Sequence, residues 1–368
     1  MEFGIGLMGY PGCWEDAAFA EEHGFGLAGF VDSPVLSGDP FVWTALAGHA
    51  TSKMKVGAFV AIPGIRTATA TAAALAAAET VAPGRVFYGT GTGYTGRLTV
   101  GFKGPVAASK LCENAARVRA LLAGEEIIEE VSGAPKRILT KYPRDLQVDP
   151  DHPLPIYVAA DGPKALQAAG EVGDGLITTL QFSGGVENRP ATFENGLAAV
   201  RSAARDVDRD LEGAYSIFHA AICILEPGES LLSPRALAHI GPITMTLFHS
   251  YACDPRVADH FPQAVRERLE IYETEVLAHL DCPRELLYQQ VHAGHLTELL
   301  DGEAGVLTEE ILRMIAVVGT AEEIVDQLRA LQDKGLKNVT FTIPRSCVRE
   351  TVLAIEQQIM PHLVPTTA

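Results

Sequence analysis

Residues 55–89 read KVGAFVAIPGIRTATATAAALAAAETVAPGRVFYG and contain one complete strand–helix–strand unit. The apolar runs at residues 55–62 and 85–89 are short and rich in Val, Phe and Gly, which is typical of buried strands. The Ala- and Thr-rich stretch 69–81 between them has the length of a helix, and it stops before Pro83, which a helix interior does not tolerate. The unit therefore predicts two parallel strands joined by a helical crossover.

The same alternation of apolar runs and helical stretches continues along the chain. Strands are predicted at residues 3–8, 26–31, 55–62, 85–89, 155–160, 175–180, 216–225 and 338–343. Helices are predicted at residues 14–23, 40–50, 69–81, 106–123, 164–172, 190–206, 321–334 and 348–362. This pattern favours an α/β fold, the (β/α)8 TIM barrel, over a doubly wound sheet, which usually has fewer strands in two halves. Because no Pro- and Ser-rich linker interrupts it, we expect a single domain over residues 1–368.

Two long insertions interrupt the barrel pattern. Residues 125–152 are charged and contain prolines, whereas residues 226–318, between the seventh and eighth strands, have a helical character, with candidate helices at 261–279 and 283–300. The active site of such a barrel lies at the C-terminal ends of the strands. Since residues 226–318 follow a strand, we expect them to form a lid or a substrate wall over that site.

The composition of the chain limits the kinds of partner that it can bind. The chain has 29 Lys and Arg against 46 Asp and Glu, a net charge of −17, which disfavours binding to nucleic acid or to an anionic membrane. The N-terminus does not resemble a signal peptide, and the longest low-polarity stretch, residues 68–78, is too short to span a bilayer. The six cysteines are scattered without a CxxC pair, which is typical of reduced thiols. We therefore expect a cytoplasmic protein that acts on small molecules.

A glycine-rich segment, GTGTGYTG at residues 89–96, follows the fourth predicted strand. Gly91, Gly93 and Gly96 match GxGxxG, but the dinucleotide-binding fingerprint normally lies in the first strand–helix–strand unit, with an acid about 20 residues further on. The glycines would still let a ligand approach the backbone, whose N–H groups can hold a phosphate or a ring carbonyl. The alternative is a plain tight turn.

Two further strand ends carry candidate ligand-binding groups. The fifth strand ends in AADGPK, residues 159–164, where Pro163 opens a helix whose free N–H groups would bind an anion and Lys164 would add a positive charge. The alternative is an ordinary helix start with a solvated lysine. Asp32, at the end of the second strand, is a candidate acceptor for a ring N–H or a ribityl hydroxyl, or a cap for the turn before Pro34.

The histidines suggest fewer functions. His292 and His295 are three residues apart, so a helix would place them on one face, but a metal site needs a further ligand and no spacing nominates one. We therefore predict no metal site. His219 lies in an apolar strand and is expected in the core, whereas His249 lies in the second insertion, within reach of a substrate. The chain has no GxSxG, HExxH or Walker A motif, so the corresponding hydrolase classes are unsupported.

In their order along the chain, these motifs resemble the bacterial-luciferase-like superfamily of flavin and deazaflavin oxidoreductases. They are most similar to the branch that includes methylenetetrahydromethanopterin reductase and deazaflavin-dependent glucose-6-phosphate dehydrogenase. The matching pieces are residues 32–34, 56–57, 63, 66, 83–86, 89–93, 159–164, 169–171, 174–175 and 319–323. The resemblance covers the barrel, roughly residues 1–179 and 318–344, and is thin over the second insertion.

The resemblance implies a barrel that binds FMN or the deazaflavin F420 at its C-terminal mouth. The implied cofactor contacts, to which we add Lys164 from its place at the helix start, are Asp32, Val60, Thr92, Gly93, Ala160, Asp161, Gly162 and Thr179. It also implies a non-proline cis peptide near Phe59–Val60, a homodimer or larger assembly, and a separate reductase that supplies the reduced cofactor. Two departures matter: Tyr94 stands where many deazaflavin enzymes carry an acid, and Ser33 stands where the sugar-phosphate dehydrogenases have a histidine.

The resulting hypothesis is an oxidoreductase that transfers hydride between bound F420 or FMN and a small organic substrate other than glucose 6-phosphate. Absence of the AQAGxSxxG run of another flavin-monooxygenase branch favours F420. The candidate proton-transfer residues are Tyr94, His249 and His295, although Tyr94 could instead stack on the cofactor, His249 could be solvated and His295 could be packed in a helix. The alternative functions are a two-component monooxygenase that uses reduced FMN and O2, and a non-catalytic flavin-binding protein.

Overall fold

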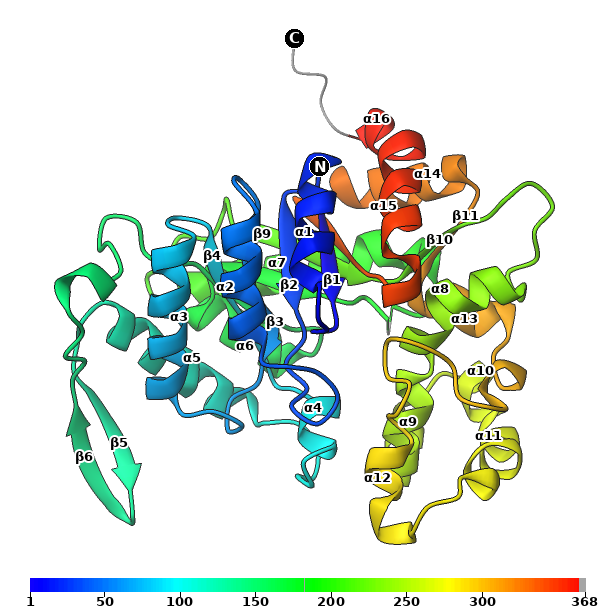
Figure 1. Ribbon diagram of the computed structural model, residues 1–368, viewed down its shortest axis with the longest axis horizontal. Helices are drawn as coiled ribbons and strands as arrows, with labels where there is room; N and C mark the ends of the chain where they lie inside the picture. Colours follow the sequence, from blue (N-terminus) through cyan, green and yellow to red (C-terminus); the bar gives the residue numbers. More distant parts are fainter. Residues whose placement is uncertain (182, 364–368) are drawn as a thin grey trace.

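A closed parallel β-barrel forms the centre of the computed structural model, which describes residues 1–181 and 183–363 (Figure 1). The barrel strands are β1 (Glu2–Leu7), β2 (Leu27–Phe30), β3 (Lys55–Ala61), β4 (Val86–Gly91), β7 (Ile156–Ala159), β8 (Gly175–Thr178), β9 (Tyr215–Ala220) and β12 (Asn338–Thr342). They follow one another around the ring in chain order, and β12 closes it by pairing with β1, where Glu2 lies opposite Asn338. The predicted TIM barrel is confirmed.

An outer layer of helices covers the strands. Its members are α1 (Cys13–Glu22), α2 (Pro40–Ala50), α3 (Ala68–Val81), α5 (Ala108–Leu122), α6 (Pro163–Val172), α7 (Arg189–Arg205), α14 (Ala321–Gln332), α15 (Val348–Gln358) and α16 (Met360–Leu363), with the 3-10 turns η2 (Val186–Asn188) and η7 (Arg345–Cys347). The short helix α4 (Thr95–Leu98) lies instead at the mouth of the barrel, against the second insertion. Several begin at a capping side chain: Thr67 accepts from the N–H of Ala70, and Thr320 forms a capping box with Glu323. No helix in the described ranges is long and apolar enough to cross a membrane.

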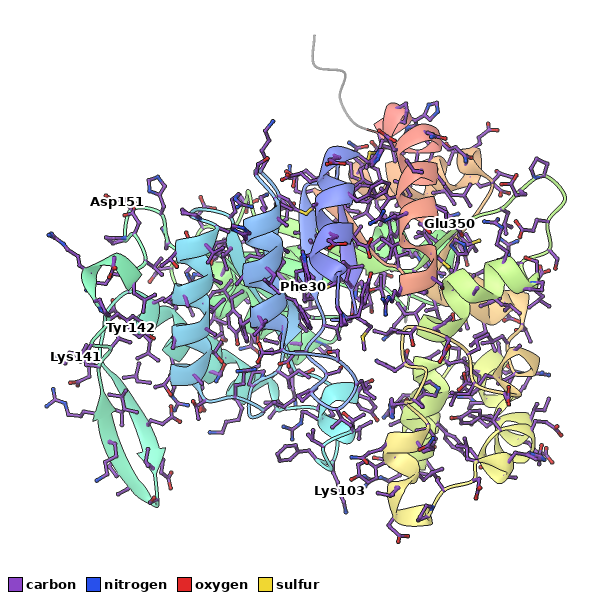
Figure 2. The ribbon with its side chains drawn as sticks, viewed as in Figure 1. Phe30, Lys103, Lys141, Tyr142, Asp151 and Glu350 are labelled. Atoms are coloured by element: carbon purple, nitrogen blue, oxygen red, sulfur yellow. The ribbon has the colours of Figure 1, made fainter. Side chains whose placement is uncertain are left out.

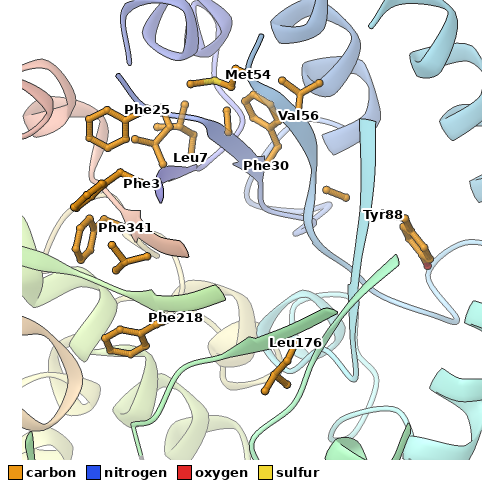
Figure 3. Close-up of a cluster of buried hydrophobic side chains, with 14 of the residues drawn as sticks. Phe3, Leu7, Phe25, Phe30, Met54, Val56, Tyr88, Leu176, Phe218 and Phe341 are labelled. Atoms are coloured by element: carbon orange, nitrogen blue, oxygen red, sulfur yellow. The ribbon is translucent and has the colours of Figure 1, made fainter. Parts of the chain in front are cut away.

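Strand residues alternate between two hydrophobic layers. Along β4, Val86 and Tyr88 pack outward in the large cluster between strands and helices, whereas Phe87 points into the barrel, where it meets Tyr157 of β7. Figure 3 shows the outward layer, in which aromatic side chains such as Phe30 fill the space under the helices. This packing holds the strand ends, and therefore the mouth of the barrel, in place.

The first insertion differs from a plain loop. Its elements are a two-stranded hairpin, β5 (Ile127–Val131) and β6 (Ala134–Ile138), followed by η1 (Arg144–Leu146). Lys141, Tyr142 and Asp151 of this insertion lie at the opposite end of the molecule from the second insertion (Figure 2). The first insertion therefore lies far from the second insertion.

The predicted strand at 216–225 is two strands. β9 ends at Ala220, and after it β10 (Ile222–Ile224) leaves the barrel and pairs in parallel with β11 (Val317–Gly319), which closes the second insertion. The pair forms a neck because both ends of the insertion pass through it. The predicted helix at 106–123 also starts late, at Ala108, since the N–H of Val106 is bound to the carbonyl of Thr92.

The second insertion is helical but consists of short pieces. They are α8 (Pro234–Thr244), α9 (Thr246–Cys253), η3 (Pro255–His260), α10 (Gln263–Arg266), α11 (Leu269–Glu275), η4 (Leu277–His279), η5 (Arg284–Leu286), α12 (Leu287–Gln290), η6 (Glu303–Gly305) and α13 (Glu309–Ile315). The prediction of a continuous helix is therefore wrong for 261–279, and for 283–300 it is wrong beyond Gln290, where turns follow. The backbone leaves the helical region at Leu296, whose φ is +59°. The insertion packs around its own hydrophobic cluster, in which the rings of Phe248 and Tyr272 lie 5.4 Å apart.

Candidate active site

A cavity of about 760 Å³ lies between the C-terminal ends of the barrel strands and the second insertion. We call its two sides the barrel wall and the insertion wall. The barrel wall includes Val60, Gly91, Thr92, Gly93, Tyr94, Ala159, Ala160, Asp161, Gly162, Lys164, Ile177 and Thr179. The insertion wall consists of Thr246, Leu247, Ser250, Val257, His260 and Phe261. The volume is in the range of pockets that enclose a cofactor or a drug-sized ligand.

The structure brings most of the predicted site residues together on the barrel wall. Those that line the cavity are Val60, Thr92, Gly93, Tyr94, Ala160, Asp161, Gly162, Lys164 and Thr179. Three predicted residues, Asp32, His249 and His295, are not among the described residues that line it. Contact of any of these residues with a cofactor stays a prediction, but nine of them share one surface.

The ends of β3 and β4 approach each other closely because of two glycines. A Cβ on Gly91 would lie 2.9 Å from Cγ2 of Val60, and a Cβ on Gly93, whose φ is +63°, would lie 2.5 Å from Cγ2 of Ile62. Glycine is therefore required at both positions. The predicted cis peptide between Phe59 and Val60 is confirmed at the same place. Together these features form a smooth surface of backbone and small side chains, which suits a flat ring.

Asp161 is a positioning residue within the barrel wall. One carboxylate oxygen accepts hydrogen bonds from the hydroxyl of Thr178 and from the N–H groups of Thr179 and Leu180, and the other accepts from the hydroxyl of Thr179 at 2.7 Å. These bonds tie the segment after β7 to the end of β8. Because its acceptor sites are already used, Asp161 holds the wall in shape and leaves Thr179 at the cavity surface.

The start of α6 provides the features expected of an anion site. Gly162 is the N-cap residue and offers no side chain to the free N–H groups of the first turn, and Pro163 follows at the first helical position. A Cβ on Gly162 would meet nothing within 4 Å, so this end of the helix opens into the cavity. Lys164 lines the cavity beside it. A phosphate or carboxylate would meet N–H donors, the positive end of the helix and an ammonium group here.

Asp32 lies behind the cavity rather than in its lining. It is only 2% exposed, and its carboxylate accepts a hydrogen bond of 3.2 Å from the N–H of Ile62. Burial raises the pKa of this carboxyl group above its usual range, although that hydrogen bond opposes the effect. In this structure, Asp32 joins the loop after β2 to the loop after β3.

Tyr94 combines access to the cavity with a protonated hydroxyl. Its side chain is half-buried and lines the cavity at the end of the glycine-rich segment. Burial, followed by the negative charge of Asp254, raises the pKa of the Tyr94 hydroxyl above its usual value of 10. The hydroxyl therefore keeps its proton at neutral pH and can donate it or a hydrogen bond to a ligand.

The other two predicted proton-transfer residues lie inside the second insertion. His249 and His295 are 1% and 5% exposed and face each other, with a ring-centroid separation of 6.3 Å. Sequence reasoning missed Ser250 and His260, which do line the cavity. The spacing of Thr246 and Ser250, four residues apart on α9, was the available signal, because it places both on one helix face.

His219 is hydrogen-bonded within the barrel, as predicted for a histidine of this apolar strand, but it is partly rather than fully buried. Its Nε2 is hydrogen-bonded to the hydroxyl of Thr342 at 2.6 Å, and its ring lies edge-on to Phe59 with centroids 4.9 Å apart. Burial lowers the pKa of His219 from 6.5 to about 4, so the ring is neutral at physiological pH. This histidine supports the strand that carries the cis peptide.

Comparison with known proteins now decides the family. The model of the luciferase-like monooxygenase family matches residues 14–338, which is most of the chain. The chain belongs to this family. Its membership confirms the predicted superfamily and the predicted class of oxidoreductase enzyme.

Known proteins resemble this luciferase-like protein in sequence or in fold. The F420-dependent glucose-6-phosphate dehydrogenase of Gordonia bronchialis is 26% identical over 95% of this chain and 92% of its own length. The 5,10-methylenetetrahydromethanopterin reductase of Methanolobus tindarius is 26% identical over 55% of this chain and 59% of its own length. Among solved structures, the F420-dependent tetrahydromethanopterin reductase of Methanopyrus kandleri has a TM-score of 0.67 and 19% identity, and the match covers 98% of this chain and 99% of that one.

Proposed function

We propose that this luciferase-like protein is an F420-dependent oxidoreductase that transfers hydride between the deazaflavin and a small organic substrate. The observation that carries the proposal is the barrel wall, where the close approach of β3 and β4 adjoins the uncapped start of α6 and Lys164. A ring and an anionic tail need these two surfaces side by side. The F420-dependent relative that matches over 95% of the chain supports F420 over FMN.

The chain's own residues divide the work of binding. Val60, Gly91 and Gly93 form the smooth surface that would support one face of the ring. The first turn of α6 and Lys164 would hold a phosphate or carboxylate group. When bound, F420 supplies the carbon that accepts or donates the hydride, so the protein has to orient it and exclude water.

The insertion wall would hold the substrate. Ser250, Thr246 and His260 present polar groups there, and Phe261 presents an apolar one. Tyr94, which lines the cavity from the barrel side, would donate a proton or a hydrogen bond to the reacting oxygen of the substrate, because its hydroxyl stays protonated. The second insertion thus acts as the substrate wall of a single domain over residues 1–368.

The proposed setting follows from the same chain. We place the enzyme in the cytoplasm, where all six cysteines, which are free thiols in the structure, would remain reduced. A separate reductase would regenerate the cofactor, and the enzyme would work as a homo-oligomer. The substrate would differ from glucose 6-phosphate, since the residue after Asp32 is Ser33, which is buried.

Titration of the purified protein with F420 and, separately, with FMN tests this function by fluorescence. We expect F420 to bind tightly and FMN weakly, and we expect bound F420 to be reduced by an organic donor or oxidised by an acceptor. Tight binding of reduced FMN with O2 consumption would replace the proposal with the two-component monooxygenase. Cofactor binding without turnover on any donor or acceptor would favour the non-catalytic flavin-binding protein.

A further inference from the structure

Three buried histidines converge inside the second insertion, and we call them the histidine cluster: His249, His292 and His295. His249 comes from α9, and the other two come from the turns after α12. They are 1%, 1% and 5% exposed. Their ring centroids lie 5.2–6.3 Å apart, and one nitrogen of each ring lies within 4.8 Å of the other two.

The outer hydrogen bonds of the cluster determine which nitrogens face inward. Nε2 of His249 lies 2.7 Å from a carboxylate oxygen of Glu303, and Nδ1 of His292 lies 2.9 Å from the carbonyl oxygen of Tyr288. Both oxygens are acceptors, so these ring nitrogens carry the protons and donate. The opposite nitrogens, Nδ1 of His249 and Nε2 of His292, therefore present lone pairs to the centre.

The inward nitrogens have no hydrogen-bond partner. Nδ1 of His249, Nε2 of His292 and Nδ1 of His295 are all buried and unpartnered within the described residues. Buried ring nitrogens without a hydrogen-bond partner are unfavourable, because burial removes the hydrogen bonds that they would make in solvent. A cation at the centre would satisfy all three at once.

We propose that the histidine cluster binds a divalent transition metal, with Zn²⁺ the best match, through Nδ1 of His249, Nε2 of His292 and Nδ1 of His295. Three imidazoles with an open fourth position form a known kind of zinc site, and imidazole is a ligand that zinc prefers. Glu303 and Tyr288 hold the outer ring nitrogens, as carboxylates and carbonyls do around metal-bound histidines. A water molecule would take the fourth position.

The cluster needs only a small contraction to reach metal geometry. A tetrahedral site with Zn–N bonds of about 2.1 Å has ligand nitrogens about 3.4 Å apart. The nitrogens lie within 4.8 Å of one another, so side-chain rotations of the three rings can close the difference. Glu303 is itself buried, and its second oxygen accepts from the N–H of Leu300 at 2.8 Å, which keeps His249 oriented during this movement.

A second cluster in the molecule provides the contrast. His239 lies near Cys347 and Glu350, but both of its ring nitrogens have partners: Nε2 is 2.7 Å from the Glu350 carboxylate and Nδ1 is 3.3 Å from the hydroxyl of Thr351. No lone pair of His239 is left to bind an ion, because Glu350 and Thr351 occupy both ring nitrogens. We expect no metal there.

The metal would act on the insertion rather than on the reacting atoms. None of the three histidines is among the described residues that line the cavity. His249 is, however, adjacent to Ser250 of the insertion wall, and a metal would join α9 to the turns at 291–297. The site would thus fix the position of the insertion wall relative to the rest of the insertion.

Metal analysis of the full-length protein tests the site directly. The protein is stripped with a chelator, given one equivalent of Zn²⁺ or Co²⁺, and freed of unbound ion by gel filtration. We expect one metal per chain by elemental analysis, and with Co²⁺ the visible d–d absorption of a four-coordinate nitrogen site. Failure of the wild-type protein to retain either metal would overturn the proposal and leave a buried water as the occupant.

Variants locate the bound metal. We expect the double variant His292→Ala/His295→Ala to lose it, and Glu303→Gln to bind it roughly 10–100-fold more weakly, the usual effect of removing an outer partner. The control His152→Ala removes an exposed histidine of the first insertion and should retain full binding. Equal zinc affinity in the wild type and the double variant would overturn the proposal. Should the double variant fail to fold, the Co²⁺ spectrum of the wild type and the affinity of Glu303→Gln decide.

Discussion

The two walls of the cavity use different chemical groups. The barrel wall presents backbone at Gly91, Gly93 and Gly162, and its carboxylate, that of Asp161, is occupied by internal hydrogen bonds. The insertion wall presents side chains, including those of Ser250 and His260. Backbone groups are the same in every residue, so a wall of backbone suits a ligand that does not change. A wall of side chains can adapt to a different ligand when its residues are substituted. This difference is consistent with the proposal that the barrel wall holds the cofactor and the insertion wall holds the substrate.

The two regions also differ in how their buried polar groups are satisfied. In the barrel, His219 is hydrogen-bonded to Thr342, and Asp32 to the N–H of Ile62. In the insertion, the inward nitrogens of His249, His292 and His295 have no partner within the described residues. Unpartnered buried atoms also occur singly around the barrel, as at Nδ2 of Asn338, whereas in the insertion three of them come from one cluster of histidine rings.

The largest expected effect comes from filling the anion site of the barrel wall. Gly162→Trp would place an indole in the space at the start of α6, where a Cβ meets nothing within 4 Å, so it should fold but exclude the cofactor. We expect F420 affinity to fall at least about 100-fold, or about 3 kcal/mol, in a fluorescence titration. Gly213→Trp is the control, because a Cβ there is equally free but lies outside the cavity lining. Unchanged affinity in Gly162→Trp would mean that the anion does not bind here.

Removal of the Tyr94 hydroxyl should affect turnover but not cofactor binding. Tyr94→Phe keeps the ring at the cavity surface and removes only the protonated hydroxyl. We expect kcat to fall by about 100-fold or more, the usual contribution of a general acid, with F420 affinity within a factor of about two. Steady-state kinetics and the same titration measure the two quantities. A loss of affinity with unchanged kcat would instead indicate that Tyr94 stacks on the cofactor.

A variant of Glu303 should destabilise the second insertion without destabilising the barrel. Glu303→Ala leaves the buried Nε2–H of His249 and the partly buried N–H of Leu300 without acceptors. We expect local unfolding of residues 287–303 to become easier by about 1–3 kcal/mol for each group, whereas the barrel strands keep their protection in hydrogen exchange. Glu350→Ala is the matched control, since that carboxylate also binds a histidine but is mostly exposed. Equal effects of the two variants would contradict the expectation that the burial of Glu303 causes the loss of stability.

Lowering the pH should reduce the stability of the barrel through His219, and we expect this effect to be smaller than the preceding ones. The pKa of His219 is lowered to about 4, so between pH 6.5 and about 4 the unfolded chain binds a proton that the folded chain does not. Stability therefore falls as the pH falls through this range, by up to about 1.4 kcal/mol per pH unit from this residue. Urea unfolding at pH 7 and 5.5 measures the loss, which we expect to be smaller in His219→Asn. Identical losses of stability in the wild type and in His219→Asn would show that His219 binds a proton as readily in the folded barrel as in the unfolded chain.

Regular patterns made the barrel predictable from the sequence. Each of the eight predicted strands corresponds to a barrel strand. Buried parallel strands and the helices between them each show a regular spacing of apolar residues, and this spacing can be recognised within one element without knowledge of its neighbours. The end of β9 at Ala220 was not predicted, since the apolar run continues into β10 while its hydrogen-bond partner changes from the barrel to β11. The apolar run itself carries no signal for that change of partner.

The sequence by itself determined the barrel, its family and the motifs that gather on the barrel wall, because those signals lie within a few residues of one another. Only the tertiary structure decided which side chains of the insertion face the cavity and which face each other. His249 precedes His292 by 43 residues, and their contact depends on how short helices pack around the cluster of Phe248 and Tyr272. Packing between distant elements leaves no periodic signal in the chain, so Ser250 and the histidine cluster became visible only in the fold.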